Sequence, residues 1–274
     1  MTIKLIALDL DGTTLNSQGK LGERNRNALK EAFDMGVNIV IATGRPFCAL
    51  PGEIKDFEPV RYVLTSNGAR ITDLHTGEAI YENCLDGHAV EAAVAMLREH
   101  NYVLETFVNG TAYIEGDYYR EVERTGKSFR DVNYILSTRR PVDNFYEFML
   151  RNKNGIENIN VNFSDISEKP AMKKKLETLP DVTITSSFDH NLEIGGASTS
   201  KAEALRRMCE IMHVEPSQML AAGDSPNDMA MLSLAGFPVA VANAKPEVKE
   251  IAKFIAPSND DDGVAVAVKK FVLK

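Results

Sequence analysis

The sequence predicts an α/β protein with a doubly wound parallel sheet and an inserted α+β domain. Near both ends of the chain, short apolar runs alternate with amphipathic stretches, and each run ends in polar residues or glycine. That alternation is typical of parallel strands joined by helices. The middle of the chain has short strand-like segments and hairpin turns, which indicate an α+β domain. We therefore expect residues 1–82 and 190–274 to form the core and residues 83–189 to form the insertion.

The first expected strand, residues 3–8, ends in Asp9, Leu10, Asp11 and Gly12. It is apolar nearly throughout, as a strand buried on both faces is. Residues two apart point to the same side of an extended chain, so Asp9 and Asp11 are expected to share a face. Ligands of open α/β sheets bind at this end of the strands. Two carboxylates held close repel each other, and a bound cation offsets that repulsion. The plainer alternative is a strand end with solvated acids.

The rest of the first part fits the same pattern. The apolar stripe of residues 23–35 predicts a helix that Gly36 ends. The next expected strand, residues 37–42, is followed by Thr43 and Gly44. A third expected strand, residues 62–66, leads into an Asn-Gly pair.

In the middle of the chain, Asn109-Gly110 separates two alternating segments and predicts a β-hairpin. We expect strands at residues 103–108, 111–114, 159–163 and 182–187, with helices around residues 90–97 and 170–179.

The α/β pattern returns from residue 192. Ser200 and Glu203 have the spacing of a capping box, which places Lys201 in the first turn of a helix. The expected strand at residues 219–222 ends in an acidic turn, residues 223–228. Further strands are expected at residues 238–242 and 254–256, followed by a C-terminal helix.

Composition excludes several classes of function. The 274 residues carry a net charge of -8, which argues against a nucleic-acid or membrane-surface partner. No apolar stretch has the length of a membrane span, and none has the features of a signal peptide. The three cysteines, Cys48, Cys84 and Cys209, are far apart and indicate thiols in a reducing cytoplasm. The oligomeric state has no signal in the sequence.

Polar groups follow several of the expected strands, and the carboxyl ends of those strands meet at one edge of the sheet. The chemistry of these polar groups fits phosphoryl transfer. Carboxylates without a His or Cys cluster favour a hard cation such as Mg²⁺. A carboxylate can also act as nucleophile and form an aspartyl-phosphate. A lysine, a hydroxyl and backbone N–H groups at helix starts would hold the phosphate. The residues expected to converge are Asp9, Asp11, Thr43, Gly44, Lys201, Asp224 and Asn227.

These segments occur in the order of the four motifs of the haloacid dehalogenase superfamily. The large α+β insertion resembles the class IIB cap of this superfamily. The segments 66–69 and 259–265 look like those of its Cof-type sugar-phosphatase branch. The resemblance implies a Rossmann-like core and a Mg²⁺-dependent phosphatase that acts on a small phosphorylated metabolite. The matching segments are Asp9-Leu10-Asp11-Gly12-Thr13, Thr43-Gly44-Arg45, Lys201 and Gly223-Asp224-Ser225-Pro226-Asn227-Asp228.

The resemblance also implies roles for the first two motifs. Asp9 would be the nucleophile and would bind Mg²⁺. Asp11 would protonate the leaving group, then activate the hydrolytic water, and its carbonyl would bind the metal. Thr43, the N–H of Gly44 and the backbone of Leu10 would hold the phosphate. A plainer interpretation of Thr43 is a strand-end hydroxyl that closes a local turn.

In the later motifs, Lys201 would hold the nucleophile and the phosphate, Asp224 would bind the metal and Asn227 would contact the phosphate. Asp228 would bind the metal directly or support a residue that does. Two plainer interpretations stay open. Lys201 could be an ordinary solvated lysine, although a cation is disfavoured at a helix N-terminus. Asp228 could be the capping-box partner of Ser225, and it could do both jobs.

Four other residues carry specific expectations. Ala202 stands where the branch often has glycine, and Thr14 stands where leucine is common, a change expected to affect packing only. Asn67 and Asn243 are interpreted as turn formers outside the site.

Two other functions compete with a phosphatase. A phosphomutase of the same superfamily would isomerise sugar phosphates and would need a bisphosphate activator. A phospho-aspartate signalling module also combines acids, a hydroxyl and a lysine on a parallel sheet. Such a module is about half as long, however, and has no place for the insertion.

Overall fold

The computed structural model describes residues 2–273, which form two compact units. Unit 1 contains the chain up to Gly44, Pro51–Tyr81 and the chain from Ser200 onward. Unit 2 contains Arg45–Leu50 and Glu82–Thr199. Each unit has its own sheet and its own apolar core.

Unit 1 is built on an eight-stranded sheet with the order β14-β13-β12-β1-β2-β3-β4-β5. The central strand β1 (Leu5–Leu8) is fully buried and pairs in parallel with β2 (Asn38–Ala42) and β12 (Met219–Gly223). The expected parallel sheet is therefore confirmed. An antiparallel edge was not expected: β4 runs against β3. The remaining strands are β3 (Val60–Thr65), β4 (Arg70–Asp73), β5 (Ala79–Glu82), β13 (Phe237–Val241) and β14 (Phe254–Ala256).

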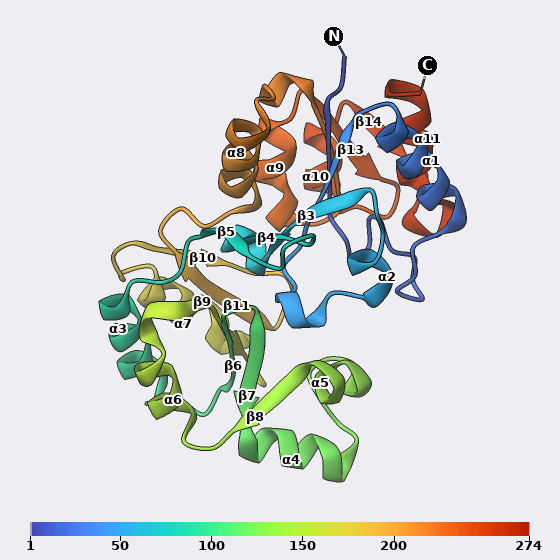
Figure 1. Ribbon diagram of the computed structural model, residues 1–274. Coiled ribbons are helices and arrows are strands. Elements are labelled where there is room, and N and C mark those ends of the chain that lie inside the picture. The colour runs from blue at the N-terminus through green and yellow to red at the C-terminus, as the bar shows by residue number, and fades with distance from the viewer. Residues whose placement is uncertain (1, 274) are drawn as a thin grey trace. The chain divides into compact units, whose positions relative to one another are not determined.

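Helices cover this sheet on two sides, which Figure 1 shows with α1 (Glu23–Asp34) beside α11 (Gly263–Phe271) and with α8 (Lys201–Met212) beside α9 (Met229–Leu234). The helices of the second pair bury Leu205, Met208 and Leu232 in one cluster with the sheet. This alternation of strand and helix is the predicted doubly wound pattern. Two short helices complete the unit, α2 (Gly52–Lys55) and α10 (Pro246–Ile251). Among residues 2–273, no helix combines the length and the apolar character needed to cross a bilayer.

Unit 2 contains a six-stranded sheet with the order β10-β11-β9-β6-β7-β8. Its expected hairpin is present: β6 (Val103–Val108) and β7 (Thr111–Glu115) pair antiparallel around Asn109 and Gly110, whose φ angles are 49° and 73°. The other strands are β8 (Arg139–Val142), β9 (Ile156–Asn162), β10 (Val182–Thr185) and β11 (Asn191–Gly196). The helices are α3 (Gly87–Leu97), α4 (Gly116–Thr125), α5 (Val132–Thr138), α6 (Phe145–Arg151) and α7 (Lys169–Leu176).

One expected boundary is wrong by about one strand. The segment from residue 190 was assigned to the core, because it precedes the lysine motif. Its strand β11 instead pairs antiparallel with both β9 and β10, so it lies inside the sheet of unit 2. One alanine and three hydroxyl residues separate the strand from Lys201, and that turn rather than the strand marks the return to unit 1.

The sheet of unit 2 has two unlike faces. One face is apolar: Leu104, Ile159 and Ile194 pack there in a single cluster with Val94 of α3 and Leu176 of α7. The strands alternate, so their other residues point to the opposite face. That opposite face carries buried charged and amide side chains, among them Glu105, Asn160 and Glu193.

A pair of glycines tests how closely the chain packs around the start of α8. Gly68 and Gly36 both have positive φ angles, 94° and 83°. A Cβ atom on Gly68 would lie 2.3 Å from the carbonyl oxygen of Ser200, whereas a Cβ atom on Gly36 would meet nothing within 4 Å. Gly36→Ala should lower the free energy of unfolding by about 1–2 kcal/mol, the cost of the left-handed backbone alone.

Gly68→Ala should cost at least about 1 kcal/mol more, because backbone atoms must also move apart. Urea denaturation of both variants measures the difference. Equal losses in the two variants would contradict the close packing at Gly68.

Candidate active site

Three strand ends bring polar residues together at one edge of the unit 1 sheet. Asp9 follows β1, Thr43 follows β2 and Asp224 follows β12. The parallel register places Leu8 beside Ile41 on one side and beside Ala222 on the other. The N–H of Asp9 donates to the carbonyl oxygen of Ala222 at 3.0 Å, which continues the pairing into the site.

Lys201 is the cation of this site. Its Nζ donates to Asp9 Oδ1 at 2.5 Å and to Asp228 Oδ1 at 2.6 Å, and its side chain has no exposed surface. The solvated-lysine interpretation is therefore wrong. Ser200 precedes α8 and accepts the N–H of Glu203 at 3.1 Å, so the predicted cap places Lys201 at the first helical position. The carboxylates offset the unfavourable position of a cation at a helix N-terminus.

Three carboxylates gather around this one ammonium group, and two of them, Asp9 and Asp228, bind it. Oxygen atoms of Asp9, Asp224 and Asp228 lie within 4.8 Å of one another. Burial raises the pKa of Asp9 well above its usual range, and the neighbouring charge of Asp228 raises it further, while Lys201 acts in the opposite direction. Burial and Asp228 also raise the pKa of Asp224. Burial lowers the pKa of Lys201, but Asp228 and Asp9 outweigh it and the pKa is raised.

The cluster thus has an excess of negative charge that a cation would offset. Its donor atoms are carboxylate oxygens, the ligands that Mg²⁺ prefers. Asp9, Asp224 and Asp228 could therefore hold a magnesium ion. Asp11 is exposed and lies outside this group of acids.

The acidic turn after β12 holds its two aspartates in different ways. Asp228 Oδ2 accepts the N–H groups of Asp224 and Ser225, each at 3.0 Å, in a capping box with Ser225. Asp228 therefore caps the turn and binds Lys201 with its other oxygen. The two oxygens of Asp224 accept hydroxyl groups of Thr13 and Ser225, at 3.0 and 2.9 Å. Both aspartates are thus fixed before any ligand binds.

The loop after Asp9 turns back at once. The carbonyl oxygen of Leu10, a fully buried residue, accepts the N–H groups of Thr14 and Leu15 at 3.1 and 2.9 Å. Asn243 Nδ2 donates to the carbonyl oxygen of Gly12 at 2.7 Å and holds the loop from a second strand end. Asn243 is therefore a structural residue, as expected.

Thr14 was expected to affect packing only, and that expectation is wrong. Its hydroxyl donates to the carbonyl oxygen of Asp9 at 2.5 Å, and its own carbonyl oxygen accepts Nδ2 of Asn25 at 3.2 Å. A leucine at this position could not make the first bond. Thr14 therefore fixes the backbone of the residue that carries the central carboxylate.

Asn67 links the second motif to the fourth, a role that sequence reasoning missed. Its N–H donates to the carbonyl oxygen of Thr43 at 3.1 Å, and its Oδ1 accepts Nδ2 of Asn227 at 3.1 Å. A Cβ atom on Gly44 would lie 3.1 Å from the same oxygen. Asn67 has a φ of 56°, so it also forms the turn that was expected. The side chain of Asn67 is buried, unlike that of an ordinary turn residue at the surface. That burial would have identified its role, but it cannot be deduced from the sequence.

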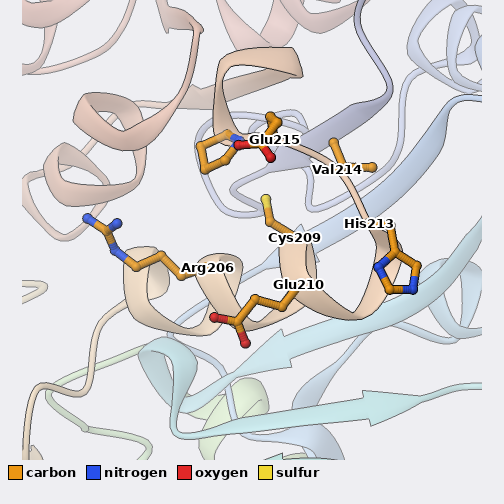
Figure 2. Close-up of a pocket in the computed structure, with 7 residues that line it drawn as sticks. Arg206, Cys209, Glu210, His213, Val214 and Glu215 are labelled. Atoms are coloured by element: carbon orange, nitrogen blue, oxygen red, sulfur yellow. The ribbon is translucent and has the colours of Figure 1, made fainter.

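A cavity in unit 1 lies away from this chemistry. It has a volume of about 450 Å³ and is lined by the last turns of α8 and the residues that follow, including Arg206, Cys209, Glu210 and His213, as Figure 2 shows. Lys201 stands at the opposite end of the same helix. No buried side-chain atom without a hydrogen-bond partner belongs to the residues that line it. The carboxylate cluster, rather than this cavity, is therefore the candidate site.

Comparison with known proteins agrees with this geometry. Residues 6–268 match the family model of haloacid dehalogenase-like hydrolases. The chain belongs to this family. It is 32% identical to the phosphatase YwpJ of Bacillus subtilis over 287 residues, covering 97% of this chain and 99% of that protein. It is 30% identical over 271 residues to YcsE of Bacillus subtilis, a 5-amino-6-(5-phospho-D-ribitylamino)uracil phosphatase, covering 99% and 96%.

The fold is also that of a solved family member. The subclass IIB sugar phosphatase BT4131 superposes with a TM-score of 0.82 at 21% identity, over 98% of each chain. The haloacid dehalogenase assignment is therefore confirmed, and the fold is that of a subclass IIB member. The protein is a phosphoric monoester hydrolase of this family.

The charge balance of the site predicts opposite effects of two substitutions. Lys201→Met leaves Asp9 and Asp228 buried without their cation, and it should lower the free energy of unfolding by about 3–5 kcal/mol. Asp224→Asn removes one of three crowded carboxylates, and the hydroxyl of Ser225 can rotate to accept from the new amide.

Asp224→Asn should therefore raise the free energy of unfolding in metal-free buffer. Urea denaturation of both variants in excess EDTA measures these changes. A loss of stability in Asp224→Asn as large as that in Lys201→Met would contradict the excess of negative charge.

Proposed function

We propose that the protein is a Mg²⁺-dependent phosphatase that hydrolyses a small phosphorylated metabolite, a sugar phosphate or a similar ester, through an aspartyl-phosphate on Asp9. The observation that carries the proposal is the buried Lys201 ammonium, which holds one oxygen of Asp9 at the shared end of three parallel strands. Asp9 Oδ2 accepts no hydrogen bond from residues 2–273, so it is available to attack phosphorus.

In the first step, Asp9 Oδ2 attacks phosphorus and the bond from phosphorus to the ester oxygen breaks. Asp11 gives its proton to the departing alcohol. In the second step, Asp11 takes a proton from water as the water oxygen attacks phosphorus, and the bond to Asp9 breaks to release phosphate. Asp11 suits this exchange because it is exposed, while Asp9 is buried beside Lys201.

The phosphate oxygens need donors and positive charge, because charge spreads over them in the transition state. Lys201 supplies the charge. The hydroxyl of Thr43, the N–H of Gly44 and the backbone of Leu10 supply donors at the same strand ends, and Asn227 supplies an amide. The Asn67 contacts with Thr43 and Asn227 support this cradle, since they fix its two sides to one another.

A bound magnesium ion would supply charge neutralisation for the phosphate. Asp9, Asp224 and Asp228 would hold it, together with the carbonyl oxygen of Asp11. Asp228 already caps the turn and binds Lys201, so a contact with the metal would be its third interaction.

The named relatives support a small substrate and not a macromolecule. YcsE is a phosphatase of a ribitylamino uracil phosphate, and BT4131 is a sugar phosphatase. We infer that this chain also acts on a phosphorylated small molecule with a polar leaving group, without a nucleic-acid or membrane partner. We further propose that it works in the cytoplasm, where such metabolites and Mg²⁺ are abundant.

Asp9→Asn should abolish hydrolysis while the fold survives, because the two side chains have nearly the same shape and the amide is a poor nucleophile. The expected loss in kcat for p-nitrophenyl phosphate is at least about 10³-fold. Phosphate release measures activity, and circular dichroism checks the fold. Substantial turnover by the purified variant would defeat the assignment of Asp9.

Chelation should stop phosphate release, and Mg²⁺ added after removal of the chelator should restore it. The Asp224→Asn variant tests the proposed metal ligands directly, because it should need a higher Mg²⁺ concentration for half-maximal activity. Metal titrations of both proteins measure this shift. Full activity in excess EDTA would rule out the metal.

A further inference from the structure

The hydroxyl of Thr14 contacts the peptide group that leads directly out of Asp9. Its oxygen donates to the carbonyl oxygen of Asp9 at 2.5 Å. That carbonyl group and the N–H of Leu10 belong to one planar unit, in which charge is shared between oxygen and nitrogen. The Thr14 hydroxyl therefore acts on the same peptide group as any acceptor of the Leu10 N–H.

The N–H of Leu10 is the unused end of this peptide group. No group among residues 2–273 accepts it, although Leu10 is fully buried. Buried N–H groups without an acceptor are rare. Leu10 directly follows Asp9, which accepts Lys201 Nζ at 2.5 Å, so this N–H belongs to the loop that carries the carboxylate cluster. Such an N–H indicates a ligand that supplies the missing acceptor.

Thr14 is held in place independently of its hydroxyl. Its N–H donates to the carbonyl oxygen of Leu10 at 3.1 Å, and its carbonyl oxygen accepts Nδ2 of Asn25 at 3.2 Å. Asn25 is itself fully buried, and its Oδ1 accepts the N–H of Ala265 in the first turn of α11 at 2.8 Å. These bonds fix the backbone of Thr14, so its hydroxyl is a preorganised donor to Asp9.

Hydrogen bonds at the two ends of a peptide group strengthen each other. A donor on the carbonyl oxygen draws charge toward that oxygen and makes the N–H a stronger donor, by about 10–30% per bond. Donors to the phosphoryl oxygens stabilise the charge that these oxygens carry in the transition state. We propose that Thr14 is a positioning residue for phosphoryl transfer, whose hydroxyl polarises the Asp9–Leu10 peptide group and strengthens the Leu10 N–H as a donor to the phosphoryl oxygens. The proposal rests on the proposed phosphatase function and adds a residue to it.

Four variants of the full-length protein isolate the hydroxyl. Thr14→Val removes it and keeps the shape of the side chain, whereas Thr14→Ser keeps it and removes a methyl group. Thr14→Ala repeats the loss of the hydroxyl with a smaller side chain. Thr72→Val is the matched control, because Thr72 of β4 is buried and its hydroxyl has no hydrogen-bond partner among residues 2–273.

The first measurement is the ¹⁵N resonance of Leu10 in protein labelled with ¹³C at the carbonyl carbon of aspartate and with ¹⁵N at leucine. Only Asp-Leu peptide groups then carry both labels, and the sequence has two, Asp9-Leu10 and Asp73-Leu74. Thr14→Val should move the Leu10 resonance upfield, because the carbonyl loses its donor, and Thr14→Ser should not. Leu74 donates to the carbonyl oxygen of Arg61 at 2.8 Å and serves as the reference that stays in place in the Thr14 variants.

The second measurement is kcat/KM for p-nitrophenyl phosphate with Mg²⁺. Removing a whole donor of this kind lowers the rate by about 10²–10³-fold. Weakening it by about 10–30% should therefore lower kcat/KM about two- to eightfold in Thr14→Val. Thr14→Ser should retain most of the wild-type value. Thr72→Val should change neither kcat/KM nor the Leu10 resonance.

The two measurements fail separately. A Leu10 resonance that stays in place in Thr14→Val would overturn the polarised peptide group, whatever the activity. A moved resonance with unchanged kcat/KM would overturn its effect on the reaction. If Thr14→Val and Thr14→Ala do not fold while Thr14→Ser does, the hydroxyl is structural and the proposal is wrong. A wild type that releases phosphate from no ester would defeat the proposed phosphatase function, and the Leu10 resonance would still decide whether Thr14 polarises the peptide group.

Discussion

The unit 1 site depends on one buried ammonium group shared by two carboxylates. Lys201 Nζ lies between Asp9 and Asp228, and none of its surface reaches solvent. Without that cation, two like charges would face each other in a medium that solvates neither. The interaction ties the first strand of the sheet to the start of α8 and to the turn after β12. Segments far apart in sequence thereby become one site.

The parallel sheet makes this contact possible. Because β1 lies between β2 and β12 with all three strands parallel, their carboxyl ends open onto the same edge. Each strand end then needs a short turn that keeps its polar groups in place. Thr14 holds the carbonyl of Asp9, Asn243 holds that of Gly12, and Asn67 connects Thr43 to Asn227. These residues position the proposed chemistry without taking part in it.

Unit 2 also buries charged and amide side chains, but on the face of a sheet and not at the ends of its strands. Its sheet uses one face for packing and fills the other with carboxyl, guanidinium and amide groups. The Glu105–Arg139 pair leaves Glu105 Oε2 and Arg139 Nη2 without a hydrogen-bond partner among residues 2–273. In unit 1 the corresponding excess is negative charge, which suits a cation. In unit 2 the atoms without a partner are a mixture of donors and acceptors, so no single charge would complete them.

The sequence by itself determined the doubly wound core, the hairpin at Asn109-Gly110, and the motif residues Asp9, Thr43, Lys201 and Asp224 at strand and helix ends. These features follow from local periodicity and turn chemistry, which act over a few residues. Only the tertiary structure decided that β11 joins the second sheet, that Lys201 is buried, and that Asn67 and Thr14 support the site. Strand pairing, burial and hydrogen bonds depend on partners far away in the chain, and a single sequence does not state which partners meet. The polar face of unit 2 is the clearest case, because the buried ion pair between Glu105 and Arg139 cannot be inferred from either residue alone.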